Sequence, residues 1–325
     1  MTRLFGILLV AAAVAAANPA ASAEPPPAAP AIRTDGVILL DLARVGDGLV
    51  AVGERGVVMR SDDAGRSWYR AASPAGATRT LTALAFSGPE SGVAVGHGGQ
   101  ILVSADGGRN WAAAESEGAA GESLLGVAAV GPGRFVAHGA FGLLLDSTDG
   151  GRSWTRRAVL ADGFDRHLYR LLPLGAEDWL LAGESGTLAR SRDGGASWTA
   201  LASPYEGSWF GALTTPRGAL LLFGMRGSVF RSEDQGGRWE KVETGTITAF
   251  NNGVVLPDGR IVLVGNAGLV AVSDDDGRRF RLSDLGRAHG FAQAAPVADG
   301  GLVLVGDGGV TRLPGLSALP QGSER

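Results

Sequence analysis

The sequence contains no cysteine, and Lys241 is its only lysine. Without cysteine the chain can form neither a disulfide nor a lipid-anchored cleavage site. Acidic and basic side chains nearly balance, 33 against 29, and they are spread along the chain instead of being grouped in blocks. A nucleic-acid-binding domain carries a basic patch or stripe. The absence of such a stripe excludes DNA and RNA as expected partners.

Long apolar runs are missing after residue 23. In residues 1–23, Arg3 precedes an uncharged apolar stretch, and Ala21-Ser22-Ala23 matches the small-residue cleavage site of a secretory signal. The apolar stretch is shorter than the ~20 residues that a membrane span needs. We therefore expect residues 1–23 to be a cleaved signal peptide. The mature protein is expected to be periplasmic or secreted, without direct membrane insertion after cleavage.

Helical periodicity is also absent after residue 23, and a repeat takes its place. The motif Ser-x-Asp-x-Gly-x-x-Trp begins at six positions, and its last copy ends in phenylalanine: Ser61, Ser104, Ser147, Ser191, Ser232 and Ser273. Successive serines are 41 to 44 residues apart. An apolar run and a Gly-x-x-Gly turn precede each copy, and a seventh such turn, Gly306–Gly309, has no motif after it. The chain therefore contains seven units, of which six are complete.

Each unit contains four short β-prone runs. In the second unit these runs are 81–86, 92–95, 100–104 and 110–114. Four strands repeated every 40 to 45 residues are typical of a propeller blade. The predicted fold is an all-β, seven-bladed β-propeller of four-stranded antiparallel blades with Asp-box repeats.

The domain boundaries follow from the repeat. We expect a proline-rich linker and possible closing strand at 24–35, the propeller at 36–314 and a C-terminal tail at 315–325. The seventh unit has room for three strands only. Either residues 31–34 return to complete it, or residues 315–319 double back as its outer strand. Closure by the chain ends would remove an exposed sheet edge, which favours the first alternative.

The Asp-box aspartates are predicted to be structural. A carboxylate at this place can accept backbone N–H bonds within its hairpin, the serine can cap the turn, and the aromatic residue can pack against the neighbouring strand. Nearly every blade has one, so these residues cannot provide specificity. They are Asp63, Asp106, Asp149, Asp193, Asp234 and Asp275.

Specificity is expected where the units differ. In a propeller the Gly-x-x-Gly turns and the connections between blades share one rim, and loops on a rigid scaffold commonly carry function. The turns differ in chemistry from blade to blade, with Glu54, Arg55, His97, Phe141, Glu184, Met225, Arg226, Asn266 and Asp307. The connections contribute the predicted binding residues Arg79, Asp165, Arg166, His167, Tyr205, Glu206, Trp209, Arg287 and His289. Trp209 could instead begin the next inner strand and be buried.

Metal and cofactor signals are absent. The four histidines show no ligand spacing, and His138 falls within a predicted strand. We expect no metal, no cofactor and no catalytic residues.

The full repeat at Val95–Trp111 and its looser copies resemble the photosystem II stability and assembly factor family, and in particular its relatives in non-photosynthetic bacteria. The segments Asp165–Tyr169 and Tyr205–Phe210 add to this resemblance. The resemblance implies an exported propeller that binds a membrane protein or its assembly intermediate, with an RND-type exporter as one candidate.

Three functions remain open at this stage. The first is a non-enzymatic binding or assembly factor, which we favour. The second is a sialidase-like glycoside hydrolase, which needs an arginine triad, a tyrosine–glutamate pair and an acid aspartate. The chain has only three tyrosines, and no pair of carboxylates suited to acid–base chemistry can be identified. The third is a sugar-binding propeller that uses the channel mouth with Tyr205 and Trp209.

Overall fold

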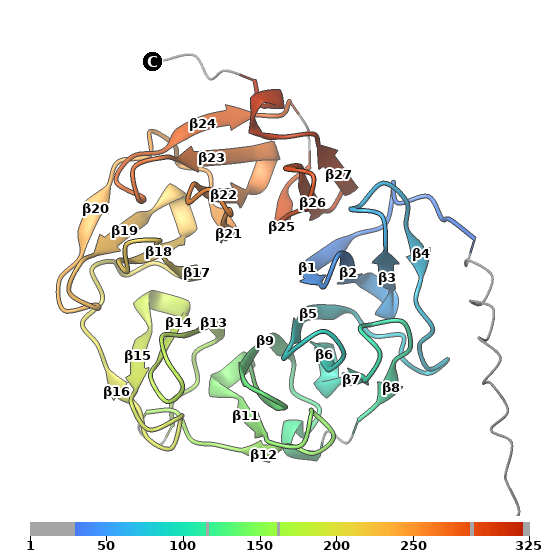
Figure 1. The fold of residues 1–325 in the computed structure, drawn as a ribbon. Helices are drawn as coiled ribbons and strands as arrows, with labels where there is room; N and C mark the ends of the chain where they lie inside the picture. Colours follow the sequence, from blue (N-terminus) through green and yellow to red (C-terminus); the bar gives the residue numbers. More distant parts are fainter. Residues whose placement is uncertain (1–29, 115–116, 161–162, 287–288, 321–325) are drawn as a thin grey trace, which may run out of the picture. The chain divides into compact units, whose positions relative to one another are not determined.

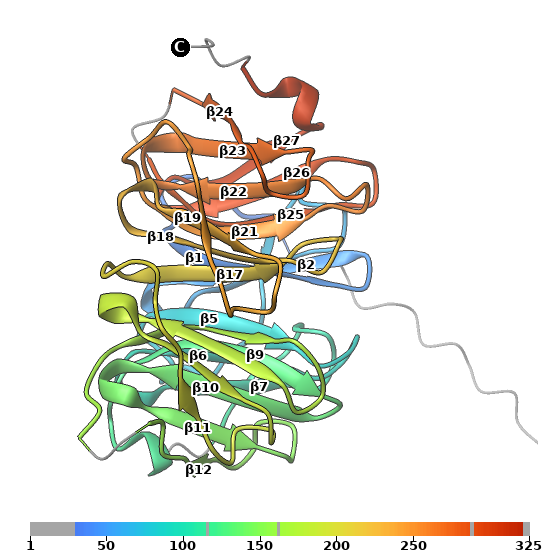
Figure 2. The same ribbon diagram turned by 90° about the vertical axis from the view of Figure 1, so that its left-hand side faces the viewer.

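The computed structural model describes residues 30–114, 117–160, 163–286 and 289–320. In this part of the chain seven antiparallel sheets surround a central axis, and each sheet has its first strand innermost (Figure 1). The fold is therefore the predicted seven-bladed β-propeller. Seen from the side, the strands run from one rim of the ring to the other (Figure 2).

The blades follow one another in chain order. Blade 1 contains β1 (Leu39–Val45), β2 (Gly48–Gly53), β3 (Val58–Ser61) and β4 (Tyr69–Arg70). Blade 2 contains β5 (Leu81–Phe86), β6 (Gly92–Gly96), β7 (Ile101–Ser104) and β8 (Ala112–Ala113). Blade 3 contains β9 (Leu124–Gly131), β10 (Arg134–Gly139), β11 (Leu144–Ser147) and β12 (Thr155–Arg156). Blade 4 contains β13 (Leu168–Pro173), β14 (Trp179–Gly183), β15 (Leu188–Ser191) and β16 (Thr199–Ala200).

The remaining blades repeat this order. Blade 5 contains β17 (Trp209–Thr214), β18 (Leu220–Gly224), β19 (Val229–Ser232) and β20 (Glu240–Val242). Blade 6 contains β21 (Phe250–Val255), β22 (Ile261–Gly265), β23 (Leu269–Ser273) and β24 (Arg281–Asp284). Blade 7 has three strands, β25 (Phe291–Pro296), β26 (Leu302–Gly306) and β27 (Gly309–Leu313). The four strands predicted for the second unit match β5 to β8 to within two residues.

The helices are single 3-10 turns. Six of them form the Gly-x-x-Gly connections between the second and third strands: η1 (Glu54–Gly56), η2 (His97–Gly99), η4 (Ala140–Gly142), η5 (Glu184–Gly186), η6 (Met225–Gly227) and η7 (Asn266–Gly268). The other two are η3 (Glu117–Ala119) and η8 (Leu316–Ala318). In the described part of the chain, no helix combines the length and the apolar character that crossing a membrane requires.

Glycine is required at both ends of these turns for different reasons. A side chain at Gly53 would overlap the carbonyl oxygen of Ile38 in the approach to the inner strand. Gly56 has a φ of +67°, and a side chain there would overlap the carbonyl oxygen of Ala77. The connection to the next blade therefore lies directly against the turn. We call the rim formed by these turns and connections the turn rim, and the opposite rim, which carries the Asp boxes, the box rim.

The hydrophobic core lies between the blades. Each of seven apolar clusters joins one blade to the next. The second strand of every blade, such as β2, is buried along its whole length, except that Arg134 at the start of β10 is half-buried. Between blades 5 and 6, for example, Phe223 packs with Phe250 and Leu263. Burying apolar surface stabilises a fold by about 25 cal/mol per Å². Because that surface lies at the blade junctions, each blade depends on both neighbours.

Arginines reinforce five of the seven junctions. At each of these, a guanidinium donates to a backbone carbonyl in the Asp box of the next blade. The pairs are Arg60 to Gly107, Arg134 to Gly194, Arg190 to Gln235, Arg231 to Asp276 and Arg312 to Ala64. We call these five residues the junction arginines. Each also pairs with a carboxylate.

Blades 3 and 4 reach this arrangement with opposite placements of the charges. In blade 4, Arg190 precedes the box serine and pairs with Asp178 at 2.6 Å. In blade 3, Asp146 precedes the box serine, and Arg134 from the neighbouring strand supplies the guanidinium at 3.0 Å. The junction therefore fixes where the guanidinium must lie, and not which strand carries it.

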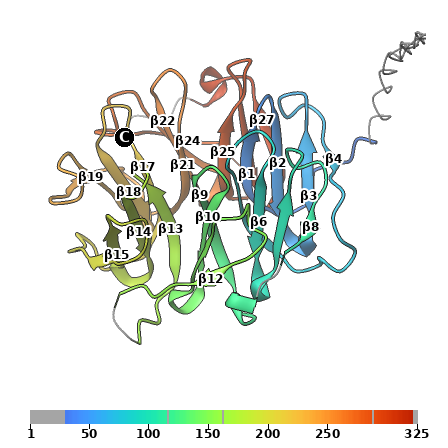
Figure 3. The same cartoon turned by 60° about the horizontal axis from the view of Figure 1, so that its bottom comes forward.

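The ring closes between blades 7 and 1, which lie side by side (Figure 1 and Figure 3). The N–H of Ile32 donates to the carbonyl of Trp68 at 2.8 Å, and Ile32 packs in the apolar cluster of this junction. The carbonyl of Thr34 lies against Gly309, as that of Ala77 lies against Gly56. Residues 31–35 thus take the position of a connection between blades.

Neither chain segment forms a fourth strand of blade 7 among the described residues. Residues 31–35 are extended without strand pairing, and the C-terminal segment turns into η8. Leu316 and Leu319 pack against the cluster between blades 6 and 7, and the hydroxyl of Ser283 donates to the carbonyl of Pro320. The C-terminal segment therefore covers blade 6 and does not double back along β27.

Candidate functional site

Each Asp box is a closed hydrogen-bonded loop. In the first, Oδ1 of Asp63 accepts the N–H of Ser67 at 2.8 Å and the hydroxyl of Ser61 at 2.8 Å. The Ser61 hydroxyl in turn accepts the N–H of Gly65, and the indole of Trp68 donates to the Gly65 carbonyl. The same bonds from the box serine and the following backbone recur around Asp106, Asp149, Asp193, Asp234 and Asp275. The carboxylates are thus engaged within their own turns.

These bonds shift the acidity of the boxes. The hydroxyl of Ser197, its backbone N–H and the hydroxyl of Ser191 lower the pKa of Asp193 to about 2. The unfolded chain takes up this proton near pH ~3.9, well before the folded one does. Protonation therefore favours unfolding, and the contribution to stability is lost as the pH falls from about 4 towards 2.

We expect the melting temperature to fall steeply between pH 4 and pH 2. Differential scanning calorimetry at half-unit steps would measure it, with Asp193→Asn as the comparison. The variant lacks the titrating carboxylate, so its melting temperature should start lower at pH 6 and fall less on acidification. Equal slopes for the two proteins would show that this box does not contribute to the acid transition.

The turn rim brings together some of the predicted binding residues. Arg166 is exposed, and its guanidinium donates to the carbonyl of Ser185 at 3.1 Å. His167 is half-buried; its ring Nδ1 accepts the backbone N–H of Phe141, and its backbone N–H donates to the carboxylate of Glu184. These hydrogen bonds link the turns of blades 3 and 4 at this rim.

The other predicted residues have different surroundings. Asp165 and Glu206 are exposed, as is Arg79, which donates to the carbonyl of Gly98. His289 is exposed beside Asp307, with 3.4 Å between ring nitrogen and carboxylate, at the far side of the ring. Arg287 lies outside the described residues.

Trp209 is a core residue. Its indole is fully buried between blades 4 and 5, donates to the hydroxyl of Ser203 at 3.1 Å and packs against Tyr205 and Phe230. Tyr205 is half-buried in the same cluster. The side chain of Trp209 therefore cannot contact a partner on the surface, because the strand β17 begins at this residue and turns it inward.

The exposed large apolar side chains lie on the turn rim, in blade 3, in blade 5 and on the connection after blade 5. Among the described residues these are Phe141, Met225 and Ile247, exposed by 60%, 36% and 87%. Phe141 and Met225 belong to Gly-x-x-Gly turns, and Ile247 follows Thr246, whose carbonyl lies against Gly227. Phe141 also has a φ of +54°, which is uncommon for a large residue. We call these three residues the rim triad.

An aromatic series leads from Phe141 into the channel. The ring of His167 lies 5.0 Å from that of Phe141 and 6.2 Å from that of Tyr169. Phe210 continues the series at 5.6 Å from Tyr169. The contacts are edge-to-face, a preferred arrangement of aromatic pairs. The series connects the outer rim with the central channel.

The central channel contains a cavity of about 480 Å³. Every inner strand has a β-bulge near its start, on the side of the turn rim, and the extra residue lines the channel. The seven extra residues are Leu40, Thr82, Leu125, Tyr169, Phe210, Asn251 and Ala292. Bulges commonly redirect side chains beside functional sites. Six residue types occupy these seven positions, and only leucine occurs twice, so the channel wall varies between blades as the rim does.

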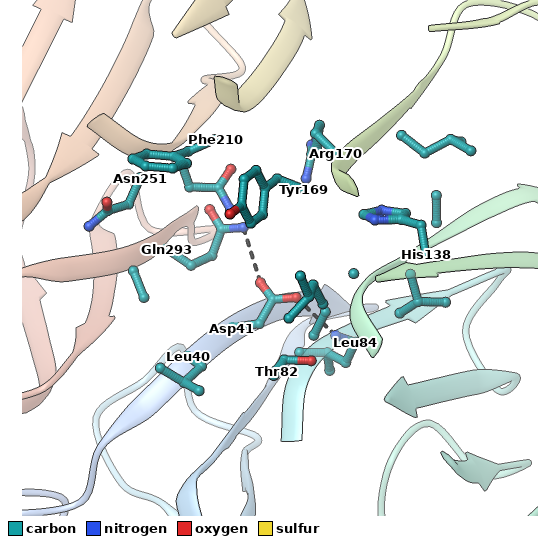
Figure 4. Close-up of a pocket in the computed structure, with 18 of the residues that line it drawn as sticks. Leu40, Asp41, Thr82, Leu84, His138, Tyr169, Arg170, Phe210, Asn251 and Gln293 are labelled. Atoms are coloured by element: carbon teal, nitrogen blue, oxygen red, sulfur yellow. Dashed lines mark hydrogen bonds between the residues drawn. The ribbon is translucent and has the colours of Figure 1, made fainter. Parts of the chain in front are cut away.

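The charged groups of the cavity come from blades 1 and 4 (Figure 4). Burial raises the pKa of Asp41, whose carboxylate accepts the N–H groups of Leu42 and Leu84 and an amide hydrogen of Gln293. Burial lowers the pKa of Arg170, and its buried Nε has no acceptor among the described residues.

His138 is the third titratable group of the cavity. Burial lowers its pKa to about 4, so the ring is neutral above that value. Its Nδ1 lies 3.0 Å from the carbonyl of Leu168, which can only accept, so Nδ1 carries the proton and Nε2 is an acceptor. The described residues contain no group of three or more metal-ligating side chains.

Sequence reasoning did not identify the channel residues. Asp41 and Arg170 follow the first two residues of an inner strand, and Asn252 and Gln293 occupy the same position in blades 6 and 7. A polar residue at this place in an otherwise apolar run was the available signal. Its meaning depends on the bulge, which strict alternation does not reveal.

Comparison with known proteins supports the fold and points to one family. The model of the family "Photosynthesis system II assembly factor YCF48" matches residues 122–270. The solved structure of YCF48 bound to D1 peptide is 19% identical, with a TM-score of 0.71, and the match covers 87% of this chain and 95% of that one. YCF48 from Cyanidioschyzon merolae is 17% identical, with a TM-score of 0.69 and coverage of 87% and 97%.

Hydrolases share the architecture as well. The GH74 xyloglucanase from Xanthomonas campestris is 15% identical, with a TM-score of 0.69, and the match covers 87% of this chain and 53% of the enzyme. This chain thus corresponds to about half of that enzyme. At these identities the likeness to solved structures concerns the fold alone. No curated protein sequence matches the chain.

Proposed function

Because the chain is an Asp-box propeller of the photosystem II assembly factor-like kind, we propose that it is a non-enzymatic, exported binding protein that recognises an exposed segment of a membrane-protein partner during assembly. The observation that carries this proposal is the rim triad, Phe141, Met225 and Ile247. Exposed apolar side chains on a rigid scaffold are typical of interaction surfaces. A structural neighbour that is described with a bound D1 peptide supports a peptide ligand.

The surroundings of the triad suit a segment with both apolar and polar side chains. Arg166 and Asp165 are exposed beside His167, and Glu206 is exposed on the next connection. An interface of this kind combines apolar anchors with a polar, solvated edge. The proposed partner segment therefore carries at least one large apolar residue flanked by charged ones. An exporter of the RND type is the partner class that we would test first.

The channel supports a binding function over hydrolysis. Glycoside hydrolysis uses two carboxyl groups, about 5 to 10 Å apart. Among the described residues that line the cavity, Asp41 is the only acidic one, and three donors already occupy its carboxylate. Turnover of a glycoside panel, xyloglucan included, by the purified protein would contradict the proposal.

Photo-crosslinking from the turn rim tests the proposal directly. A photoreactive amino acid at Arg166 should capture an integral membrane protein from solubilised membranes, and mass spectrometry should map the crosslink to one segment. A synthetic peptide of that segment should bind the propeller. Phe141→Asp combined with Ile247→Asp should weaken its binding at least about tenfold, since each buried apolar anchor is worth about 1.5–3 kcal/mol.

The matched control changes exposed residues of the box rim. Asp47→Lys combined with Arg238→Asp alters charge without touching the rim triad, and binding of the peptide should stay unchanged. Equal binding by the rim variant and the box-rim variant would place the interface elsewhere and refute the proposal.

A further inference from the structure

Arg170 presents unused hydrogen-bond donors to the channel cavity. Its Nε is buried without an acceptor, and the guanidinium faces the cavity from blade 4 (Figure 4). A guanidinium stays charged throughout the physiological pH range, so Arg170 cannot lose a proton to avoid leaving a charged donor buried and unpaired. Leaving a buried donor unpaired destabilises the fold, and more so when the donor is charged. A carboxylate, which pairs with both sides of the guanidinium fork, would remove that destabilisation.

Donors from other blades point to the same cavity. The side-chain oxygen of Asn252 accepts the N–H of Gly253, which leaves the amide hydrogens of Asn252 as donors. Gln293 uses its oxygen for the N–H of Ala294 and one amide hydrogen for Asp41, so its second hydrogen is available. Blades 4, 6 and 7 therefore offer donors to a ligand that is rich in oxygen acceptors.

Asp41 limits the charge of such a ligand. It lies on blade 1, three blades away from Arg170 around the seven-bladed ring, and its carboxylate faces the same cavity. A second anionic group placed near Asp41 would be repelled, whereas a hydroxyl group can donate to its oxygens. The cavity thus fits one negative charge at Arg170 and neutral, hydroxyl-bearing chemistry towards Asp41.

The size and the apolar wall favour a ring over a short chain. A cavity of about 480 Å³ is within the range of small-molecule sites and is far larger than acetate needs. The rings of Tyr169 and Phe210 pack edge-to-face beside Arg170 and offer an apolar surface to the C–H face of a sugar. His138 adds an acceptor at Nε2 for a hydroxyl hydrogen.

We propose that the channel cavity binds a small hydroxylated monocarboxylate of the sugar-acid class, with its carboxylate on Arg170 and its hydroxyl groups between Asn252, Gln293 and Asp41. This site lies inside the ring and is separate from the rim triad, so it does not depend on the proposed partner function.

The test compares ligands that differ in one feature. Isothermal titration calorimetry and saturation-transfer difference NMR would be run with D-glucuronate, D-glucose and acetate. Glucuronate should bind at least about tenfold more tightly than either of the others, because only it has both the carboxylate and the hydroxyls. A glucuronate-ended trisaccharide distinguishes a free sugar acid from the end of an acidic polysaccharide.

Variants assign the binding to the cavity. Arg170→Gln should reduce affinity for glucuronate at least about tenfold, and Arg170→Lys should restore it only in part, because lysine lacks the planar fork. Asn252→Ala should weaken glucuronate binding and leave acetate binding unchanged. Arg281→Gln, on the outer strand of blade 6, should bind like the natural protein.

Circular dichroism would verify the fold of each variant, and Asn252→Ala keeps the test valid if Arg170→Gln does not fold. No binding of glucuronate at 10 mM would overturn the proposal, as would equal affinity of the folded Asn252→Ala protein. Tighter binding of an acidic peptide at Arg170 would also overturn it, and would assign the cavity to a protein ligand.

Discussion

Replacing Arg231 by methionine is expected to lower the free energy of unfolding by about 3–5 kcal/mol, because it leaves the buried Asp276 with only the more distant Arg278, at 3.9 Å, as a cation. The pair is 2.7 Å apart, and the two side chains are only 7% and 3% exposed. Nε of Arg231 also donates to the backbone carbonyl of Asp276 in the box of blade 6. For a domain of this size the melting temperature should fall by roughly 10 °C. Thermal unfolding followed by circular dichroism would measure it.

A second substitution separates the unpaired charge from the lost contact. Asp276 has a φ of +65°. Three other boxes have glycine at the position that Asp276 occupies, namely Gly107, Gly150 and Gly194. Adding Asp276→Gly to Arg231→Met removes the uncompensated carboxylate and relieves the backbone, so the double variant should recover much of the stability. If the double variant were no more stable than Arg231→Met, the buried charge would not be the cause.

Replacing Trp209 by alanine is expected to have an effect of similar size through a different cause. The fully buried indole fills the space between blades 4 and 5, packing against Tyr205 and Phe230. Removing a large core side chain costs about 3–5 kcal/mol, part of it from the cavity that remains. The hydroxyl of Ser203 would also lose one of its two donors and keep only the backbone N–H of Tyr205. Chemical denaturation would give the change in free energy.

Trp209→Phe provides the matched control, since it keeps most of the apolar volume and should lose much less stability. Binding of a partner segment should change with Trp209→Ala only in proportion to the unfolded fraction. A loss of binding by fully folded Trp209→Ala, at unchanged stability, would return this residue to the recognition surface.

The repeat predicted the architecture because it reports a local requirement that recurs in every blade. Glycines such as Gly53 and Gly56 are needed wherever one chain segment lies against another, and the box needs its serine and aspartate to close the turn. Residue identity and spacing alone are enough to recognise these local requirements. The Asp-box units and their strands could therefore be derived without coordinates.

The inner wall could not be derived in this way. Each bulge adds one residue to the inner strand, which changes the side to which the following residues point. Asp41 and Arg170 become neighbours of one cavity only after seven blades close into a ring, and no local pattern records that closure. The burial of Trp209 could not be predicted for a similar reason. The strand β17 begins at this residue, and the sequence does not fix the start of a strand to within one residue.

The junction arginines were partly visible in the sequence. Arg60, Arg190 and Arg231 each directly precede a box serine. Their role in joining blades could not be read from the sequence, because the acceptor is a carbonyl about 45 residues later, in the next blade. Blade 3, where Asp146 and Arg134 exchange places, would also have broken any simple motif.

The choice of arginine at the blade junctions has a consequence for alkaline conditions. A guanidinium keeps its proton at any pH below ~12, whereas the amine of a lysine begins to lose its proton near pH ~10. The junction arginines therefore keep their positive charge in base, and the carboxylates that they pair with are already ionised there. We therefore expect the blade junctions to weaken in acid, where their carboxylates gain protons, and to keep their ion pairs in base.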